Sequence, residues 1–349
     1  MLEPRTFEGD AAEASAFIVP CWRAAYPHHP IALWDERYFE WQLLAGRPAA
    51  RDLLVAAYDG TRLVGAHFAE AFPFELRGEP IVASQGSWFS VDPEYRRRGI
   101  GRLLVEEQRR RHRERGLAFL SGFGVRGTLG PAFWKAFGDT RPLGPIGFWY
   151  RVLDDRGLRE SMAKPSDRIL VRLIAGVTRP IGLPESEAPG VRDYASNDLP
   201  RCEELANALA SGCDLAFRWT RERLATQLDH EGLPRTLVLE RGGRVEGLVN
   251  WYPLGTEGRR RLRIAVLDLV AFGEASASER RGLLGSALRR MREDGLALAM
   301  TLRRPGRQPT RALWATGFVP IYAEYDALAT TADPALRLEG LRRVHLHWR

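Results

Sequence analysis

An internal repeat constrains this chain of 349 residues more than any other feature. The segment WDERYFEWQL from Trp34 recurs as WTRERLATQL from Trp219, with Trp, Gln and Leu at the same places. Each copy precedes two strand-like stretches joined by an Asp-Gly or Gly-Gly pair, which is typical of a hairpin turn. A third apolar stretch, a basic loop with glycine and an amphipathic helix follow in both. The shared order predicts two tandem domains of one fold.

The length agrees with two domains, because one hydrophobic core seldom supports more than about 300 residues. We expect an N-terminal domain in residues 1–153, a linker with one helix in 154–187 and a C-terminal domain in 188–349. The linker helix is expected in SDRILVRLIAGV, with Ser166 or Asp167 as its cap, and packed on a domain. The alternative is a membrane-surface role, given Arg168 and Arg172. The predicted fold class is α/β, with a mixed, mostly antiparallel sheet flanked by helices in each domain.

Composition excludes several classes of function. Hydrophobic residues make up 45% and charged residues 27%, which is typical of folded globular proteins. No apolar run reaches the roughly 20 residues that cross a bilayer, and no signal peptide is evident, so we expect a cytoplasmic protein without a membrane partner. The three cysteines lack metal-ligand spacing, so no metal is expected. The net charge of +7 lacks an accompanying aromatic stacking pattern, so no nucleic-acid partner is expected. The oligomeric state stays open.

The segment VDPEYRRRGIGR, residues 91–102, lies between a predicted strand and a predicted helix. The first N–H groups of a helix have no partner inside the helix, and its dipole places positive charge there, so such a loop binds phosphate. Gly99 and Gly101 allow unusual dihedral angles and close approach of an oxygen. The residues after Gly101 fit neither the Rossmann nor the Walker pattern.

This loop resembles the acetyl-CoA pyrophosphate loop of the GNAT N-acetyltransferase superfamily, R/Q-x-x-G-x-G/A, through Arg96, Gly99 and Gly101. The resemblance implies acetyl-CoA as co-substrate and transfer of its acetyl group to a primary amine of a small molecule or peptide. It also implies that the strand before the loop binds the thioester and pantetheine, and that the loop N–H groups bind the pyrophosphate. The cofactor-binding residues it implies are Phe89, Ser90, Val91, Arg96, Arg97, Arg98, Gly99, Ile100, Gly101 and Arg102.

The catalytic acid and base of the family are not evident. Trp134 stands where many members carry a tyrosine whose hydroxyl protonates the leaving thiolate. Gln85 stands where some members carry a glutamate that acts as the general base. A hairpin turning near residues 77–79 would place Glu70 on the same face as Gln85, so Glu70 is the candidate base. The alternative is that Glu70 is an exposed strand carboxylate. His28, His29 and His67 are further candidates, or structural residues.

The second half has lost the loop pattern, because Gly282 and Gly285 are three residues apart instead of two. Its expected role is structural or substrate-shaping, with Asp268 as a structural residue or substrate contact. Two rival functions stay open. One is a CoA-binding regulatory or scaffold protein without turnover. The other is an acyltransferase with another donor, such as a longer acyl-CoA or aminoacyl-tRNA.

Overall fold

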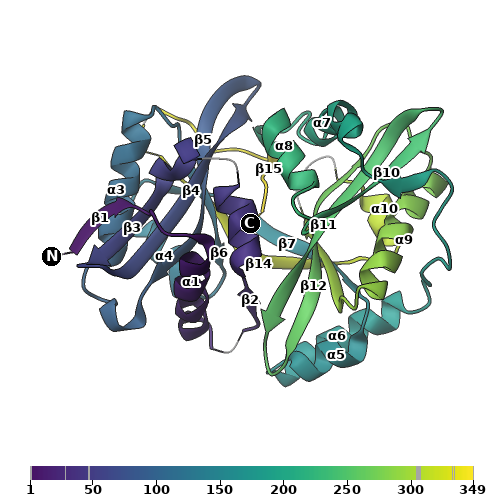
Figure 1. Ribbon diagram of the computed structural model, residues 1–349, viewed down its shortest axis with the longest axis horizontal. Coiled ribbons are helices and arrows are strands. Elements are labelled where there is room, and N and C mark those ends of the chain that lie inside the picture. The colour runs from purple at the N-terminus through teal and green to yellow at the C-terminus, as the bar shows by residue number, and fades with distance from the viewer. Residues whose placement is uncertain are drawn as a thin grey trace.

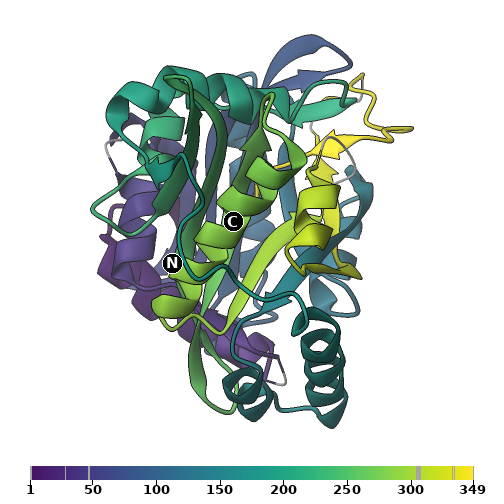
Figure 2. The same ribbon diagram turned by 90° about the vertical axis from the view of Figure 1, so that its right-hand side faces the viewer.

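A computed structural model describes residues 2–27, 29–45, 48–303, 308–331, 333 and 335–348. His28 lies outside these residues. In the described part of the chain, 15 strands form one continuous sheet that runs through both halves, and helices cover its two faces (Figures 1 and 2). The predicted α/β class with a mostly antiparallel sheet is confirmed.

The first half contains β1 (Leu2–Thr6), α1 (Ala11–Ala25), β2 (Ile31–Leu33), α2 (Glu36–Phe39), β3 (Leu54–Asp59), β4 (Arg62–Leu76), β5 (Glu79–Val91), α3 (Ile100–Glu114), β6 (Leu120–Val125), α4 (Leu129–Lys135) and β7 (Thr140–Val152). The helices α5 (Asp155–Ser161) and α6 (Pro165–Thr178) follow. The second half contains β8 (Val191–Asp193), α7 (Leu199–Ala208), β9 (Leu215–Phe217), α8 (Arg221–Leu228), β10 (Arg235–Arg241), β11 (Arg244–Glu257), β12 (Arg261–Phe272), α9 (Ala277–Glu293), β13 (Leu298–Arg303), α10 (Thr310–Ala315), β14 (Val319–Thr330) and β15 (Val344–His345).

The repeated segments lie against each other between the two halves. The first forms α2 and the π-helical turn that follows it, and the second forms α8. Gln42 and Gln227 occupy the same place in the repeat, and Nε2 of Gln42 lies 3.4 Å from Oε1 of Gln227. The indole N–H of Trp41 donates to the carbonyl of Thr226, its counterpart in the repeat, at 2.8 Å. The repeat therefore marks an approximate twofold relation between the halves.

The two halves exchange strands across this relation. From the first half, β2 pairs with β11 of the second, and from the second half, β9 pairs with β4 of the first. Near the centre of the sheet, β14 lies between β6 and β7 of the first half, and β7 also pairs with β13. The sheet therefore crosses the boundary predicted at residue 153, and each half completes the sheet of the other.

Successive side chains of a strand point to opposite faces of the sheet and therefore contribute to two separate cores. In β3, the buried side chains of Leu54, Ala56 and Tyr58 join the main core, which also contains residues of α1, α2, α7 and α8. The alternate side chains of Val55 and Ala57 pack against α3 on the other face. In the second half, α9 covers the corresponding face of the sheet (Figure 2). Both faces of the sheet are thus covered, as its long apolar strands require.

The linker differs from its prediction in two respects. It contains two helices, α5 and α6, where one was expected. The expected caps Ser166 and Asp167 lie inside the first turn of α6, because the helix begins at Pro165 after Lys164. Proline suits the first helical position, since its missing N–H would have no helical partner there.

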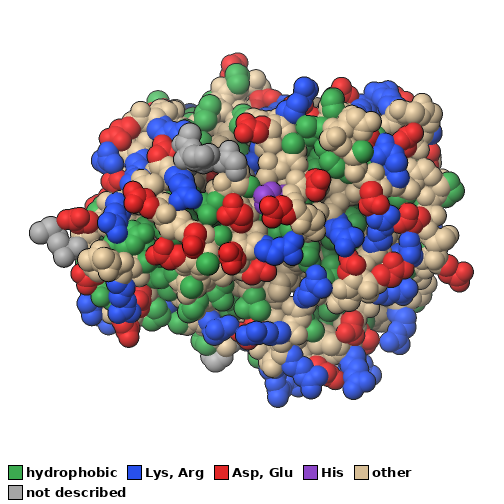
Figure 3. Space-filling model, viewed as in Figure 1, with side chains coloured by type: hydrophobic (Ala, Val, Ile, Leu, Met, Phe, Trp, Pro, Cys, Tyr) green, Lys and Arg blue, Asp and Glu red, His purple; other side chains and the backbone are tan. Residues whose placement is uncertain are grey.

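Charged side chains of both signs alternate over most of the face shown in Figure 3, with Lys and Arg gathered along its lower edge, where α5 and α6 lie. In the described residues, no helix is long and apolar enough to span a membrane.

Candidate acyl-CoA site

The start of α3 leaves its N–H groups available. Gly99 precedes the helix with a φ of 81°, a left-handed conformation that favours glycine, and no side chain caps the helix. The first backbone hydrogen bond of the helix joins the N–H of Leu103 to the carbonyl of Gly99. The N–H groups of Ile100, Gly101 and Arg102 precede this bond, so they can donate to an anion in front of the helix.

The cations of the loop outnumber its anions. Arg62 forms ion pairs with Asp92 and with Glu94, both at 2.8 Å. Arg62 thus offsets part of the negative charge of these two loop carboxylates. Arg96, Arg97, Arg98 and Arg102 are exposed around the start of α3. The loop therefore presents positive charge and free backbone donors in one place, as a pyrophosphate requires.

The strand before the loop has an open edge. Parallel β5 and β6 pair only at Ser84 with Leu120 and at Gln85 with Ser121. Beyond this point β5 continues to Val91, paired on its other edge with β4. A bulge accompanies the divergence, with Trp88 at a φ of 53°. From residue 86 to 91, β5 therefore runs on toward the start of α3 without ladder pairing to β6.

Aromatic side chains line this strand on the side of α4. The ring of Phe89 lies 5.1 Å from that of Phe133 and 5.4 Å from that of Trp134, between centroids. His67 contacts Phe89 and Trp134, and its burial lowers the imidazole pKa to about 3. A histidine with so low a pKa is neutral and a weak base near pH 7. Trp134 and His67 are packing residues of this cluster.

Glu70 lies in the seam between the halves. It is opposite Gln85 across the β4–β5 hairpin, whose turn at Arg77 and Gly78 is where the sequence predicted it. The alternative of an exposed strand carboxylate is wrong, since Glu70 is only 8% exposed. Its Oε1 lies 3.5 Å from Nε of Arg223, on α8 of the other half.

A chain of buried polar side chains continues from this ion pair. Arg223 donates to Gln42 at 2.7 Å, and Gln42 meets Gln227 at the approximate twofold. Gln227 in turn donates to Asp268 on β12 at 2.7 Å. Asp268 is 4% exposed. Glu70 and Asp268 thus stand at the two ends of one network that joins the halves.

A second carboxyl group was missed by the sequence analysis. Glu324 lies on β14, one residue before Tyr325, which pairs with the last residue of β6, Val125. The hydroxyl of Tyr150 donates to it at 2.8 Å. Burial raises the pKa of Glu324, and the nearby Asp167 adds to this rise. Only the exchange of β14 into the first half brings this carboxyl next to β6, so no local pattern could reveal it.

In the described residues of the second half, the start of α9 does not form a comparable loop. Gly282 and Gly285 lie inside α9, where an added Cβ would meet Ala188 at 2.7 Å and Pro184 at 3.3 Å. The start of α9 is closed by a capping box, in which Ser276 and Glu279 bond to each other's backbone N–H groups. These glycines therefore serve helix packing, and the start of α9 is capped by side chains of the chain itself, unlike the start of α3.

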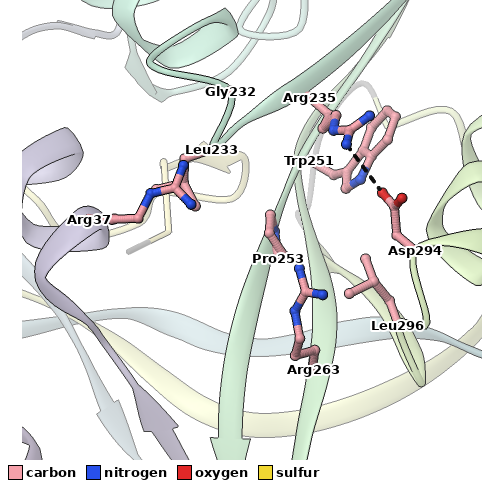
Figure 4. A pocket seen from close by; sticks show the side chains of 9 residues that line it. All are labelled: Arg37, Gly232, Leu233, Arg235, Trp251, Pro253, Arg263, Asp294 and Leu296. Carbon is pink, nitrogen blue, oxygen red and sulfur yellow. Dashed lines mark ion pairs between the residues drawn. The ribbon is translucent and has the colours of Figure 1, made fainter.

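A cavity of about 290 Å³ opens in the second half, away from the loop (Figure 4). It lies beside a short stretch of β11 that, among the described residues, has no strand partner on one edge. There, β10 pairs with β11 up to Trp251, and β2 begins to pair only at Gly255. Its lining residues lie on both sides of β11 and β12: Arg37, Gly232, Leu233, Arg235, Trp251, Pro253, Arg263, Asp294 and Leu296. None of them belongs to the glycine loop or the open strand edge, so this cavity is distinct from the candidate site.

Comparison with known proteins agrees with this geometry. Residues 12–138 match the family model described as an acetyltransferase (GNAT) domain. The sequence matches no curated protein. The match ends at residue 138, so it covers the loop, the open strand edge and α4.

Solved structures resemble the whole chain. One structure of Saccharomyces cerevisiae N-myristoyltransferase with bound myristoyl-CoA has a TM-score of 0.77 and 15% identity, over 100% of this chain and 89% of that chain. Another structure of the same enzyme with myristoyl-CoA has a TM-score of 0.75 and 14% identity, over 100% and 84%. At such identity the likeness establishes a common fold, including the arrangement of two halves.

Proposed function

We propose that this chain is an acyltransferase of the GNAT superfamily, which transfers an acyl group from acyl-CoA to a primary amine. The observation that carries the proposal is the junction of an open strand edge with an uncapped, glycine-led helix start in the first half. The diverging strands would admit pantetheine, and the start of α3 would hold the pyrophosphate. The residues assigned are those named from the sequence, from Phe89 to Val91 and from Arg96 to Arg102.

The reaction needs little more than positioning. The nitrogen of a neutral amine attacks the thioester carbonyl, and backbone N–H groups of β5 next to the loop would stabilise the developing oxyanion. The C–S bond then breaks and CoA leaves as its thiolate. A thiol has an ordinary pKa of about 8.5, so its thiolate can leave without a dedicated acid. Trp134 therefore need not replace the tyrosine hydroxyl.

Two carboxyl groups are candidates for the base that takes the proton from the amine. Glu70 was predicted from the sequence, but a proton on it would disrupt a buried ion pair with Arg223, which costs free energy. Glu324 has a raised pKa, as a base working near neutral pH requires, and lies beside the end of β6. We therefore assign the base to Glu324 and retain Glu70 as the alternative.

The donor we propose is acetyl-CoA, since the matching family model is an acetyltransferase domain. The rival donor is a longer acyl-CoA, because the structural neighbours are N-myristoyltransferases with myristoyl-CoA bound. The acceptor we propose is the amine of a small molecule or peptide. The contacts between the halves would make the second half a wall of the acceptor site.

Calorimetric titration of acetyl-CoA and of myristoyl-CoA into the protein tests this assignment. The double variant Arg97→Glu, Arg98→Glu reverses charge at the exposed loop and should weaken binding of either donor at least about tenfold, by repelling the pyrophosphate. Arg113→Glu, exposed in the last turn of the same helix, is the matched control and should bind normally. A Gly101→Glu variant is less clean, because an added Cβ would lie 3.2 Å from the ring of Phe133.

Absence of binding of both donors to the wild type would refute the proposal. Tight binding of myristoyl-CoA with weak binding of acetyl-CoA would show that the donor is a longer acyl-CoA. Binding without single-turnover acyl transfer to any amine would favour the scaffold function. Salt-sensitive binding of RNA, with transfer from aminoacyl-tRNA, would favour that donor instead.

A further inference from the structure

Helix α6 presents an apolar surface to solvent. In the described residues, six large apolar side chains are exposed, and four of them belong to this one helix. They are Ile169, Leu170, Leu173 and Val177, with exposed fractions of 61%, 42%, 63% and 64%. Isolated exposed apolar residues are common on protein surfaces, but four on three adjacent turns form a patch that needs an explanation.

The fold does not require this patch. At 100° per residue, the four exposed side chains lie on one side of α6. The buried residues Val171, Ile174, Ala175 and Thr178 lie on the opposite side and pack with Leu158 of α5 and Val152 of β7. One apolar face therefore attaches α6 to the protein, and a second faces outward.

Cations border the outward face. Arg168 and Arg172 are one turn apart along its flank, and Lys164 precedes the helix. Among the described residues, no ion pair joins these three to a carboxylate, whereas Arg156, Arg159 and Arg260 nearby all have acidic partners. The tip of the β11–β12 hairpin adds the exposed Arg259, whose N–H donates to the carbonyl of Ser161 at 2.7 Å. This is the edge where Figure 3 shows Lys and Arg gathered.

We infer that α6 is an interfacial helix that docks the protein on a lipid bilayer surface with anionic headgroups. An apolar face bordered by unpaired cations is what such a surface binds, through burial of the apolar side chains and attraction of the cations to the headgroups. A second copy of this chain is a poorer occupant, because a symmetric contact between two α6 helices would bring Arg168 and Arg172 of both copies together. This assignment revises the sequence expectation of no membrane partner and does not depend on acyl transfer.

Co-sedimentation of the full-length protein with vesicles tests the inference. We expect binding to phosphatidylcholine vesicles containing about 30% phosphatidylglycerol, weaker binding to phosphatidylcholine alone, and release by added salt. Leu173→Asp, Val177→Asp should lower the partition coefficient at least about tenfold by removing apolar contact. Arg168→Glu, Arg172→Glu should lower it selectively for the anionic vesicles.

The matched control is Val82→Asp, which adds charge at an exposed apolar residue of β5 away from α6 and should bind like the wild type. Circular dichroism melting verifies that each variant is folded, as expected for changes at exposed positions. Wild-type protein that stays in the supernatant with anionic vesicles overturns the inference. So does a wild-type dimer that Leu173→Asp, Val177→Asp dissociates without any vesicle binding, since the face would then be a self-association surface.

Discussion

At the scale of single residues, the two glycines of the loop are needed for different reasons. Gly99 has a φ that favours glycine, and an added Cβ there would meet no atom within 4 Å, so its backbone conformation is what matters. Gly101 is helical, and its missing side chain leaves room for Phe133. The sequence predicted both positions from one pattern, but the pattern could not separate a backbone requirement from a packing requirement.

The pH dependence of catalysis depends on Glu324. The base must be ionised, so kcat/KM should rise with pH through the pKa of Glu324, which burial raises above its ordinary value of 4.5. Tyr150→Phe removes a hydrogen bond that favours the ionised carboxylate, so it should move this rise to higher pH. Glu324→Gln should abolish the rise and lower kcat by about 100-fold or more.

Rate profiles of the wild type and these variants, measured with one amine acceptor, check this expectation. Glu70→Gln is the parallel variant. A profile that Glu324→Gln leaves unchanged and Glu70→Gln abolishes would return the base to the residue predicted from the sequence.

At the scale of elements, α3 and α9 occupy the same place in the repeat but begin differently. No side chain caps α3, whereas a capping box closes the start of α9. The strand, helix and hairpin order was predictable because it depends on local periodicity and on turn residues such as Asp59-Gly60 and Gly242-Gly243. Ser276 and Glu279 form a capping box that is visible in the sequence as Ser-x-x-Glu and was not predicted. Gly65, where a Cβ would meet Ile100 at 2.7 Å, was missed because strand and helix are distant in sequence.

The different starts of the two helices can be tested directly. Ser276→Ala removes the cap of α9 and should lower the free energy of unfolding by about 1 kcal/mol, measured by urea denaturation. Because α9 is assigned no part in CoA binding, donor affinity should stay the same. A loss of donor affinity without loss of stability would mean that the second half also binds the donor.

At the scale of the whole molecule, the exchange of strands was beyond the reach of the sequence. The repeat revealed two equivalent halves, but it could not show that β2 and β9 cross over or that β14 enters the first half. Strand partners are determined by tertiary packing. Alternation of apolar and polar residues predicts which face of a strand is buried, but not which strand pairs with it. The predicted division at residues 153 and 188 therefore describes the repeat along the chain, while the sheet spans it.

This architecture predicts that the first half is not stable alone. A fragment of residues 1–153 lacks β9 and β14, so the edges of β4, β6 and β7 lose their partners, and exposed edges favour aggregation. We expect no cooperative thermal unfolding of this fragment by circular dichroism. Co-expression with residues 154–349 should restore a folded complex. A fragment that unfolds cooperatively on its own would contradict the prediction.

The position of β14 also bears on how such a chain can change over generations. After a duplication, a second copy whose loop has decayed would ordinarily be free to disappear. Here its strand β14 pairs with the outer edge of β6, the strand whose pairing with β5 ends at the candidate site. Deleting the second copy would therefore remove a support of the first. Mutations can erase its ligand-binding chemistry, whereas selection on the surviving site preserves its backbone.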